Sequence, residues 1–121
     1  MTGCKGQIGI PLVKALTKEV GEDNIIATDI SDKKVDFTCR EDKLDITDFD
    51  KFNKMVKDNK ITYIVHLGAI LSALGEKMPD KALNINVNGT INALNIAREH
   101  GCQIFIPSTI ASFGGDHFLK D

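Results

Sequence analysis

The chain has 121 residues, of which 42% are hydrophobic, and its 15 Lys and Arg residues nearly balance 17 Asp and Glu residues. This ordinary composition argues against disordered, collagen-like and coiled-coil proteins, and the length suits one domain with a single core. The small net charge argues against a nucleic-acid or membrane partner, and no run of 18 apolar residues is present to span a bilayer.

The first third of the sequence predicts a helix followed by a short strand. Apolar residues recur at helical spacing over residues 7–20, Pro11 is tolerated in or near the first turn, and Gly21 can end the helix. Residues 24–29 (NIIATD) then predict a short apolar strand. In the polar segment that follows, we expect one more short strand at residues 35–38.

The remaining sequence repeats this alternation. Thr47 can cap a helix over residues 48–58. Residues 61–67 (ITYIVHL) and 103–107 (QIFIP) predict strands buried on both faces, because their apolar runs are nearly continuous, and residues 79–100 between them predict one long helix. Strands that alternate with helices indicate βαβ units and a parallel sheet, so we expect an α/β fold.

A glycine-rich loop opens the first predicted helix. The segment TGCKGQIG places Gly3, Gly6 and Gly9 at the spacing G-x-x-G-x-x-G. Such glycines allow a tight turn, a close approach of the backbone to a pyrophosphate, and close packing of the helix on the sheet, while the helix N-terminus attracts the anion. An ordinary glycine-rich turn is the alternative explanation, because the triplet alone is weakly specific.

Asp29 lies twenty positions after Gly9, at the end of the next predicted strand. A carboxylate at this place can bind the two ribose hydroxyls of NAD and repel the extra phosphate of NADP. Alternatively, Asp29 only caps the end of its strand. Because the carboxylate and the glycine loop occur together at this separation, the sequence predicts an NAD site.

The cysteines and histidines form no disulfide or metal-binding pattern. Three widely spaced cysteines, without an apolar signal core at the N-terminus, favour an intracellular, reducing compartment. The three histidines share no metal-ligand spacing, and we expect His66 to be hydrogen-bonded at the end of a buried strand. Cys4 precedes a helix N-terminus, which can lower the pKa of its thiol and make it an oxidation site, but we expect it to be simply a tolerated small residue.

Taken as a whole, the sequence resembles the extended short-chain dehydrogenase/reductase family, which includes sugar-nucleotide epimerases, and within it the L-threonine 3-dehydrogenases. The resemblance covers essentially the whole chain. The glycine loop, the Asp-Ile pair at residues 29–30 and NVNGT at residues 86–90 are common to the superfamily. The stretches HLGAILSALGE at residues 66–76 and PSTIASFG at residues 107–114 favour threonine dehydrogenases over epimerases.

The resemblance implies a Rossmann-like doubly wound parallel sheet, with residues 1–121 forming a partial NAD-binding Rossmann domain. It implies contacts to every part of the coenzyme. The pyrophosphate residues are Gly3, Gly6, Gln7, Ile8 and Gly9; the adenosine residues are Asp29 and Ile30 at the ribose and Asp45 and Ile46 at adenine; the nicotinamide-side residues are Leu67, Gly68 and Ala69, with Asn86 stabilising the strand ends nearby. Alternatively, Asp45 leads into a helix as a cap and Asn86 only bonds a loop.

The resemblance also implies a substrate site. Ser72 and Thr109 would face the substrate, and Thr109 matches the family's Ser/Thr that binds the substrate hydroxyl beside a catalytic tyrosine. Alternatively, Ser72 forms a turn and Thr109 an ordinary cap. The family's catalytic Tyr and Lys fall roughly two dozen residues beyond the Thr109 position, past Asp121, and Tyr63 lies in a predicted buried strand. We therefore expect no turnover from this chain by itself.

The start of the chain also differs from the family pattern. The family's opening strand precedes the Thr-Gly pair, whereas only Met1 and Thr2 stand before Gly3. That strand lies between the strand that ends at Asp29 and the strand that begins at Ile61. We therefore expect an incomplete sheet with unpaired backbone edges and an open core, and interpret the chain as the N-terminal part of a larger enzyme.

In that enzyme NAD would oxidise L-threonine to 2-amino-3-oxobutanoate. Two other functions stay open: a nucleotide-sugar epimerase or dehydratase, and a non-catalytic NAD-binding remnant. The predicted helix at residues 79–100 is apolar on more than one side, which fits a homodimer interface or burial under another part of the protein. Cytoplasmic and mitochondrial locations are both compatible with the sequence.

Overall fold

The computed structural model describes residues 1–68 and 79–107. Helices and strands alternate along these ranges, which confirms the predicted α/β class. In chain order the elements are α1 (Gly9–Val20), the 3₁₀-helix η1 (Glu22–Asn24), β1 (Ile26–Asp29), β2 (Arg40–Lys43), α2 (Phe49–Asp58), β3 (Tyr63–Val65), α4 (Pro79–Leu83), the π-helix η2 (Asn84–Asn88), α5 (Gly89–His100) and β4 (Gln103–Phe105).

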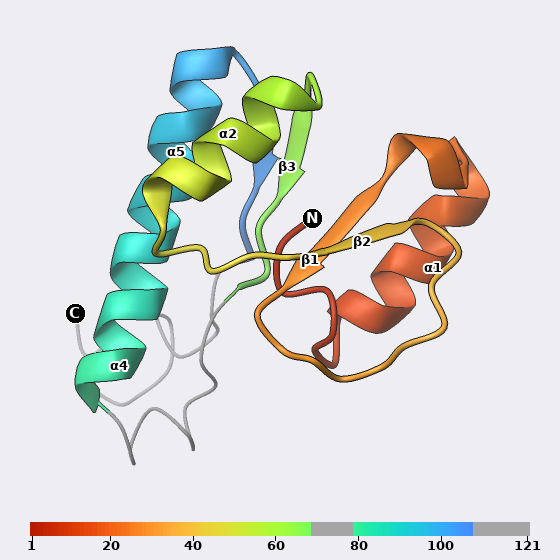
Figure 1. Cartoon of the computed structure of the whole chain (residues 1–121), viewed down its shortest axis with the longest axis horizontal. Helices are drawn as coiled ribbons and strands as arrows, with labels where there is room; N and C mark the ends of the chain where they lie inside the picture. Colours follow the sequence, from red (N-terminus) through yellow and green to blue (C-terminus); the bar gives the residue numbers. More distant parts are fainter. Residues whose placement is uncertain (69–78, 108–121) are drawn as a thin grey trace, which may run out of the picture.

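The strands form two parallel pairs, β1 with β2 and β3 with β4. Met1 and Thr2 lie between the pairs and connect them (Figure 1). The Met1 nitrogen donates to the Ile26 carbonyl at 2.8 Å, the Thr2 N–H donates to the Val65 carbonyl at 2.9 Å, and Thr2 forms a parallel bridge with His66. The resulting order, β2–β1–(Met1 and Thr2)–β3–β4, is the doubly wound order that the resemblance implies.

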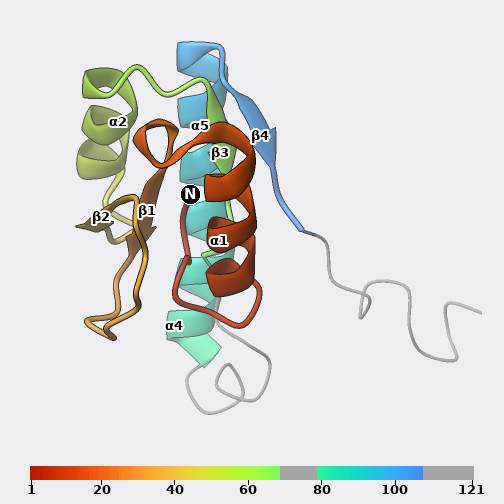
Figure 2. The same cartoon turned by 90° about the vertical axis from the view of Figure 1, so that its right-hand side faces the viewer.

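Helices cover both sides of these strands. α1 lies beside β1 and β2, whereas α2 and α5 pack together on the other side, next to β3 (Figures 1 and 2). The chain winds outward in one direction through α1 and in the other through α5, and the right-handed crossovers that are the rule between parallel strands then put helices on both sides. In the described ranges, no helix is long and apolar enough to cross a membrane.

Within residues 1–68 and 79–107, the buried side chains form two separate clusters. The larger one lies among α2, α5 and β3, and the smaller one lies between α1 and β1. The larger cluster contains Leu44, Ile46, Phe52, Val56, Ile64, Ala93, Ile96 and Ala97. The smaller cluster contains Cys4, Val13, Ile25, Ala27 and Cys39.

Three predictions for the first half differ from the structure. The second strand is at Arg40–Lys43 and not at residues 35–38. Its position is decided by pairing with β1, and its charged residues are tolerated because it is a mostly exposed edge strand. α2 is capped by Asp48, whose carboxylate accepts from the Lys51 N–H at 3.2 Å, and not by Thr47, whose hydroxyl donates to Asp45. The helix predicted from residue 7 begins at Gly9.

The second half also differs from the prediction in two ways. The helical stretch predicted over residues 79–100 contains a wider π-helical turn at Asn84–Asn88, and Gly101 ends it with a left-handed φ of 68°. The last two strands are only partly buried. Tyr63 is 51% exposed and Phe105 is 48% exposed, since both line an open cleft between the strand pairs.

Candidate functional site

The predicted cofactor residues gather at one edge of the strands. The glycine loop follows Thr2, Asp29 ends β1, Asp45 follows β2, and Leu67 follows β3. Parallel strands bring all these carboxyl ends to the same edge, and Thr2 lies where the chain order reverses. The structure therefore provides a crevice of the kind in which doubly wound folds bind ligands.

Two loop glycines are required by the packing of the chain itself. Gly3 has a φ of 66°, and a Cβ there would lie 2.6 Å from the Leu67 backbone. A Cβ at Gly9 would lie 2.5 Å from the Gly3 carbonyl oxygen. Any larger residue would push the loop away from β3 or from the start of α1, so these glycines are explained without a ligand.

Gly6 has no such explanation within the protein. It is exposed, its φ lies outside the left-handed region, and the nearest atom to an added Cβ is the Gly3 oxygen at an ordinary 3.5 Å. The neighbouring α1 begins at Gly9, with Ile8 at its N-cap, and has neither a capping side chain nor an acidic residue in its first turn. The exposed loop therefore presents an uncapped positive helix end beside a position without a side chain, which fits a pyrophosphate.

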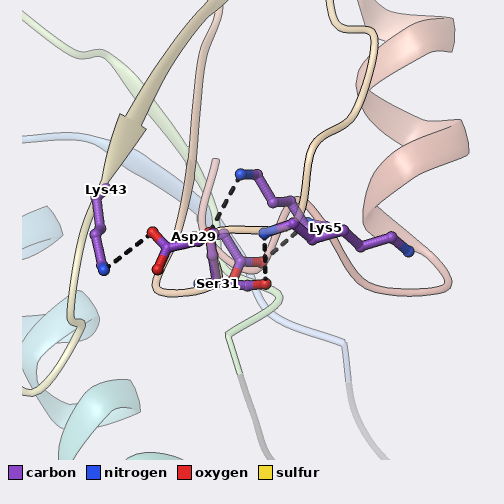
Figure 3. Close-up of polar contacts among 6 residues, drawn as sticks. Lys5, Asp29, Ser31 and Lys43 are labelled. Atoms are coloured by element: carbon purple, nitrogen blue, oxygen red, sulfur yellow. Dashed lines mark hydrogen bonds and ion pairs between the residues drawn. The ribbon is translucent and has the colours of Figure 1, made fainter.

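Asp29 is fixed beside this loop (Figure 3). Its Oδ2 accepts from the Lys5 N–H at 2.9 Å, and its Oδ1 accepts from the Ser31 N–H at 2.9 Å. The Lys5 ammonium donates to the Ser31 carbonyl at 3.2 Å. Each carboxylate oxygen keeps a second lone pair, so the group can cap the strand end and still accept from ribose hydroxyls. Ile30, the next residue, is 54% exposed.

The two predicted adenine residues differ in exposure. Asp45 is exposed, and its Oδ1 accepts from both the N–H and the hydroxyl of Thr47, at 2.9 and 2.7 Å. Ile46 is 7% exposed, because its side chain packs against Gly68 and Gly89. A Cβ at Gly89 would lie 2.5 Å from Ile46 Cδ1, so α5 approaches closely only because Gly89 has no side chain. Little of the Ile46 side chain is left for a base.

Thr2 and His66 form a buried polar network behind the site. Thr2 Oγ1 accepts from the N–H groups of Leu67 and Gly68, both at 3.1 Å, and lies 2.8 Å from His66 Nδ1. Because the hydroxyl already accepts two hydrogen bonds, its own proton goes to Nδ1, which places the imidazole proton on Nε2. The amides of Leu67 and Gly68 are thus occupied by Thr2, and only their carbonyls are open to a ligand.

The network continues to the helix. His66 Nε2 lies 3.4 Å from Thr90 Oγ1, which donates to the Asn86 carbonyl at 2.7 Å. Asn86 is exposed and stands in the π-helical turn. His66 is 2% exposed, and burial lowers the pKa of its imidazole, so it is neutral near pH 7. The expected hydrogen bond at His66 is confirmed.

Cys4 is not a reactive thiol. It is 1% exposed, and burial raises its pKa to about 11, so the alternative of a thiol with a lowered pKa at the helix N-terminus is wrong. Its Sγ donates to the Met1 carbonyl at 3.3 Å. Across residues 1–68 and 79–107, no group of three or more His, Cys, Asp or Glu side chains could hold a metal ion.

Three predicted site residues, Ala69, Ser72 and Thr109, lie outside the described residues. Conversely, the structure adds two residues that the motifs did not indicate. Lys5 fixes Asp29 through its backbone and Thr2 organises the end of β3. The glycine spacing carries no signal for Lys5, whereas the position of Thr2 directly before Gly3 could have suggested a contact with a neighbouring strand.

Comparisons with known proteins place this geometry in a family. Residues 1–120 match the model of the NAD dependent epimerase/dehydratase family. The chain is 39% identical over 116 residues to the L-threonine 3-dehydrogenase, mitochondrial, of Bos taurus, and 38% identical over 117 residues to the inactive L-threonine 3-dehydrogenase, mitochondrial, of Homo sapiens. Each match covers 94% of this chain, but only 31% of the bovine protein and 50% of the human one.

A solved structure shows the same fold. The L-threonine 3-dehydrogenase of Trypanosoma brucei superimposes with a TM-score of 0.87 and 44% sequence identity, over 93% of this chain and 36% of that one. The fold is thus a partial Rossmann-like fold, as the sequence predicts. Because the family model matches the chain over nearly its whole length, the chain belongs to the NAD dependent epimerase/dehydratase family.

Proposed function

We propose that this chain is the coenzyme-binding part of an NAD-dependent L-threonine 3-dehydrogenase. The observation that carries the proposal is Gly6, a glycine that the fold does not require, placed between an uncapped helix end and the fixed carboxylate of Asp29. The similarity to L-threonine 3-dehydrogenases of about 40% identity supports the choice of substrate. The reaction would convert L-threonine and NAD to 2-amino-3-oxobutanoate and NADH.

The described residues suit the separate parts of the coenzyme. The N–H groups at the start of α1 would bind the pyrophosphate, with Gly6 allowing the close approach. Asp29 would accept from the adenosine ribose hydroxyls, and its negative charge would disfavour a phosphate on that ribose. Bound NAD supplies the hydride acceptor, and these residues hold and orient it.

The first test compares two loop glycines by calorimetric NAD titration and thermal unfolding. We expect Gly6→Val to change the free energy of unfolding by no more than about 0.5 kcal/mol, as a surface substitution does, so the melting temperature should hardly move. NAD binding should be lost, because the valine side chain occupies the pyrophosphate position. Gly3→Ala is the contrasting variant. It should lower the melting temperature, since its Cβ meets the Leu67 backbone. Undiminished NAD affinity in Gly6→Val would refute the proposed site.

The second test concerns the ribose. We expect Asp29→Ala to weaken NAD binding by roughly 1.5–3 kcal/mol for each charge-assisted hydrogen bond that is lost. Asp36→Ala is the matched control, because its carboxylate is exposed and lies on the same half of the molecule. Thermal unfolding without NAD separates this effect from the loss of the Lys5 and Ser31 contacts. Equal NAD affinities for Asp29→Ala and wild type would disprove the ribose contact.

A non-catalytic NAD-binding role is the second candidate. It is favoured by the similarity to a human protein whose name describes it as inactive. Because we expect no turnover from this chain by itself, the two candidates are distinguished by joining it to the remaining part of the Trypanosoma brucei L-threonine 3-dehydrogenase and measuring NADH formation from L-threonine and NAD. Production of NADH supports the dehydrogenase, and binding without production supports the second candidate.

We also propose that the helical stretch from α4 to α5 forms a homodimer interface. Four apolar side chains at helical spacing are exposed there: Leu83, Val87, Ile91 and Leu94, at 43–64%. Sedimentation at rising protein concentration should show a dimer for the wild type. A charged residue in the stripe, as in Leu94→Lys, should shift the protein to monomer, and a monomeric wild type would exclude the interface.

A further inference from the structure

The turn that follows β2, at residues 45–48, is held in shape by its own residues. The Asp48 N–H donates to the Asp45 carbonyl at 3.0 Å. The Thr47 N–H and hydroxyl both donate to Asp45 Oδ1, at 2.9 and 2.7 Å. These bonds lie within the turn, so they fix its shape but not its place in the molecule. Because both side-chain bonds end on Oδ1, the exposed carboxylate keeps Oδ2 as an acceptor.

A side chain of α5 fixes the place of this turn. Asn92 Nδ2 donates to the Ile46 carbonyl at 2.9 Å, across 46 residues of sequence. A carbonyl oxygen only accepts, so the amide of Asn92 must turn its nitrogen toward Ile46. The Ile46 side chain contacts the same helix, since a Cβ at Gly89 would lie 2.5 Å from Ile46 Cδ1. The turn is thus attached to α5 by a hydrogen bond and by close packing.

Asn92 is a polar residue beside the buried face of α5. The buried residues of this helix are Gly89, Ala93, Ile96 and Ala97. Position 92 is three residues after Gly89 and four before Ile96, so it lies at the edge of the same face, and its side chain is partly buried. An apolar residue would suit the packing of this face equally well. The bond to Ile46 is therefore what an asparagine adds at this position.

The turn stands next to the proposed ribose site. Asp29 pairs with Lys43 in the β1–β2 register, and the Leu44 N–H donates to the Asp29 carbonyl at 3.0 Å. Asp45 follows directly, so the carboxylates of Asp29 and Asp45 lie at the ends of neighbouring strands. Adenine is joined to the ribose that Asp29 would bind, and its 6-amino group is a donor. A carboxylate only accepts, so it suits this amino group.

We propose that Asn92 is a positioning residue for coenzyme recognition, which holds the turn so that Asp45 Oδ2 accepts from the 6-amino group of adenine. The proposal rests on the proposed function, because Asp29 must first place the adenosine ribose. Asn92 acts through Ile46 and not by touching the coenzyme. Without its bond the turn keeps its shape, but the carboxylate is no longer fixed relative to the base, and the selection for the amino group is lost.

The test compares NAD with an analogue in which hydrogen replaces the 6-amino group of adenine, by calorimetric titration of the full chain. We expect the wild type to bind NAD about tenfold more tightly, since the missing hydrogen bond has a charged acceptor. Asn92→Leu should reduce this preference below about threefold. Its affinity for the analogue should stay unchanged, because the pyrophosphate and ribose contacts remain. Asn95→Leu, at an exposed position of the same helix, is the matched control and should keep the full preference.

A double-mutant cycle separates positioning from general damage. Asp45→Ala removes the acceptor, so Asn92→Leu should not change the ratio of the two affinities further in that background. If Asn92→Leu does not fold in a thermal scan, Asn92→Ala, which adds no bulk, takes its place. A full preference for NAD in the Asn92 variant, or equal wild-type affinities for NAD and the analogue, would overturn the proposal and leave the coenzyme site standing. A wild type that does not bind NAD would refute the proposed function, and the positioning role with it.

Discussion

The two halves of the molecule divide stability and ligand contact between them. The half with α2, β3, α5 and β4 buries eight residues in its cluster, including Phe52 and Ile96. The half with α1, β1 and β2 buries five, of which two are cysteines, yet it carries the glycine loop and Asp29. The site therefore lies mainly on the thinner half, whose geometry depends on close backbone contacts more than on a large core.

The halves are joined by a narrow polar connection. Thr2 pairs with β3 through its backbone and holds two further amides and His66 through its hydroxyl. The apolar cleft lies between the two clusters, so they do not support each other by direct burial. This comparison predicts that substitutions in the larger cluster lower the free energy of unfolding the most. It also predicts that a substitution at Thr2 lowers it more than the small change in side-chain volume suggests.

The largest expected effect is on the larger cluster. Phe52 is 2% exposed, and Phe52→Ala should lower the free energy of unfolding by about 3–5 kcal/mol, because it removes a ring and leaves a cavity. Val13→Ala in the smaller cluster should cost about 2 kcal/mol, since it removes only two methyl groups. Urea denaturation measures both. A greater loss from Val13→Ala would reverse the assignment of stability to the two halves.

The next effect is on the connection. Thr2→Val keeps the shape but removes the hydroxyl, which leaves the Gly68 amide and His66 Nδ1 without this partner, while the Leu67 N–H keeps its bond to the Thr2 carbonyl. A buried group left unpaired costs about 1–3 kcal/mol, so urea denaturation should show a loss in that range despite the near-identical volume. Thr2→Ser retains the oxygen and serves as the control. Equal losses for both variants would mean that the methyl group, and not the hydroxyl, stabilises this position.

Much of the fold followed from the sequence because local patterns and global topology agree. The apolar spacing of α1 predicts a helix, and the short apolar segment of β1 predicts a strand. Their alternation implies parallel pairing of the strands. The position of β2 did not follow, since Arg40–Lys43 has no strand-like composition and pairs only because β1 presents an edge. The π-helical turn at Asn84–Asn88 also has no periodic signal.

For the site, the motif located the loop but could not separate the roles of its glycines. Gly3 and Gly9 are required by backbone contacts, whereas Gly6 is not, and this distinction depends on distances to Leu67 and Cys4 that no spacing encodes. The burial of Ile46 was equally hidden, because it results from the close approach of Gly89 across the fold. Long-range packing decided each of these points.

The smallest expected effect is the pH dependence of the connection. Burial lowers the pKa of His66 in the folded state, so between that pKa and the ordinary value near 6.5 the unfolded chain binds more protons than the folded one. The stabilising contribution of neutral His66 is therefore complete above about pH 6.5 and is lost as the pH falls toward the lowered pKa. A single group can contribute at most about 1.4 kcal/mol per pH unit in this range.

Urea denaturation of wild type and His66→Gln at a series of pH values isolates this term. The difference between their free energies of unfolding should shrink as the pH falls below 6.5, because only the wild type loses the contribution of the neutral imidazole. His100 is present in both proteins, so its contribution cancels in the difference between their free energies of unfolding. A difference that stays constant from pH 7 to 5 would mean that His66 titrates alike in both states, and the connection between the halves would then be insensitive to protonation.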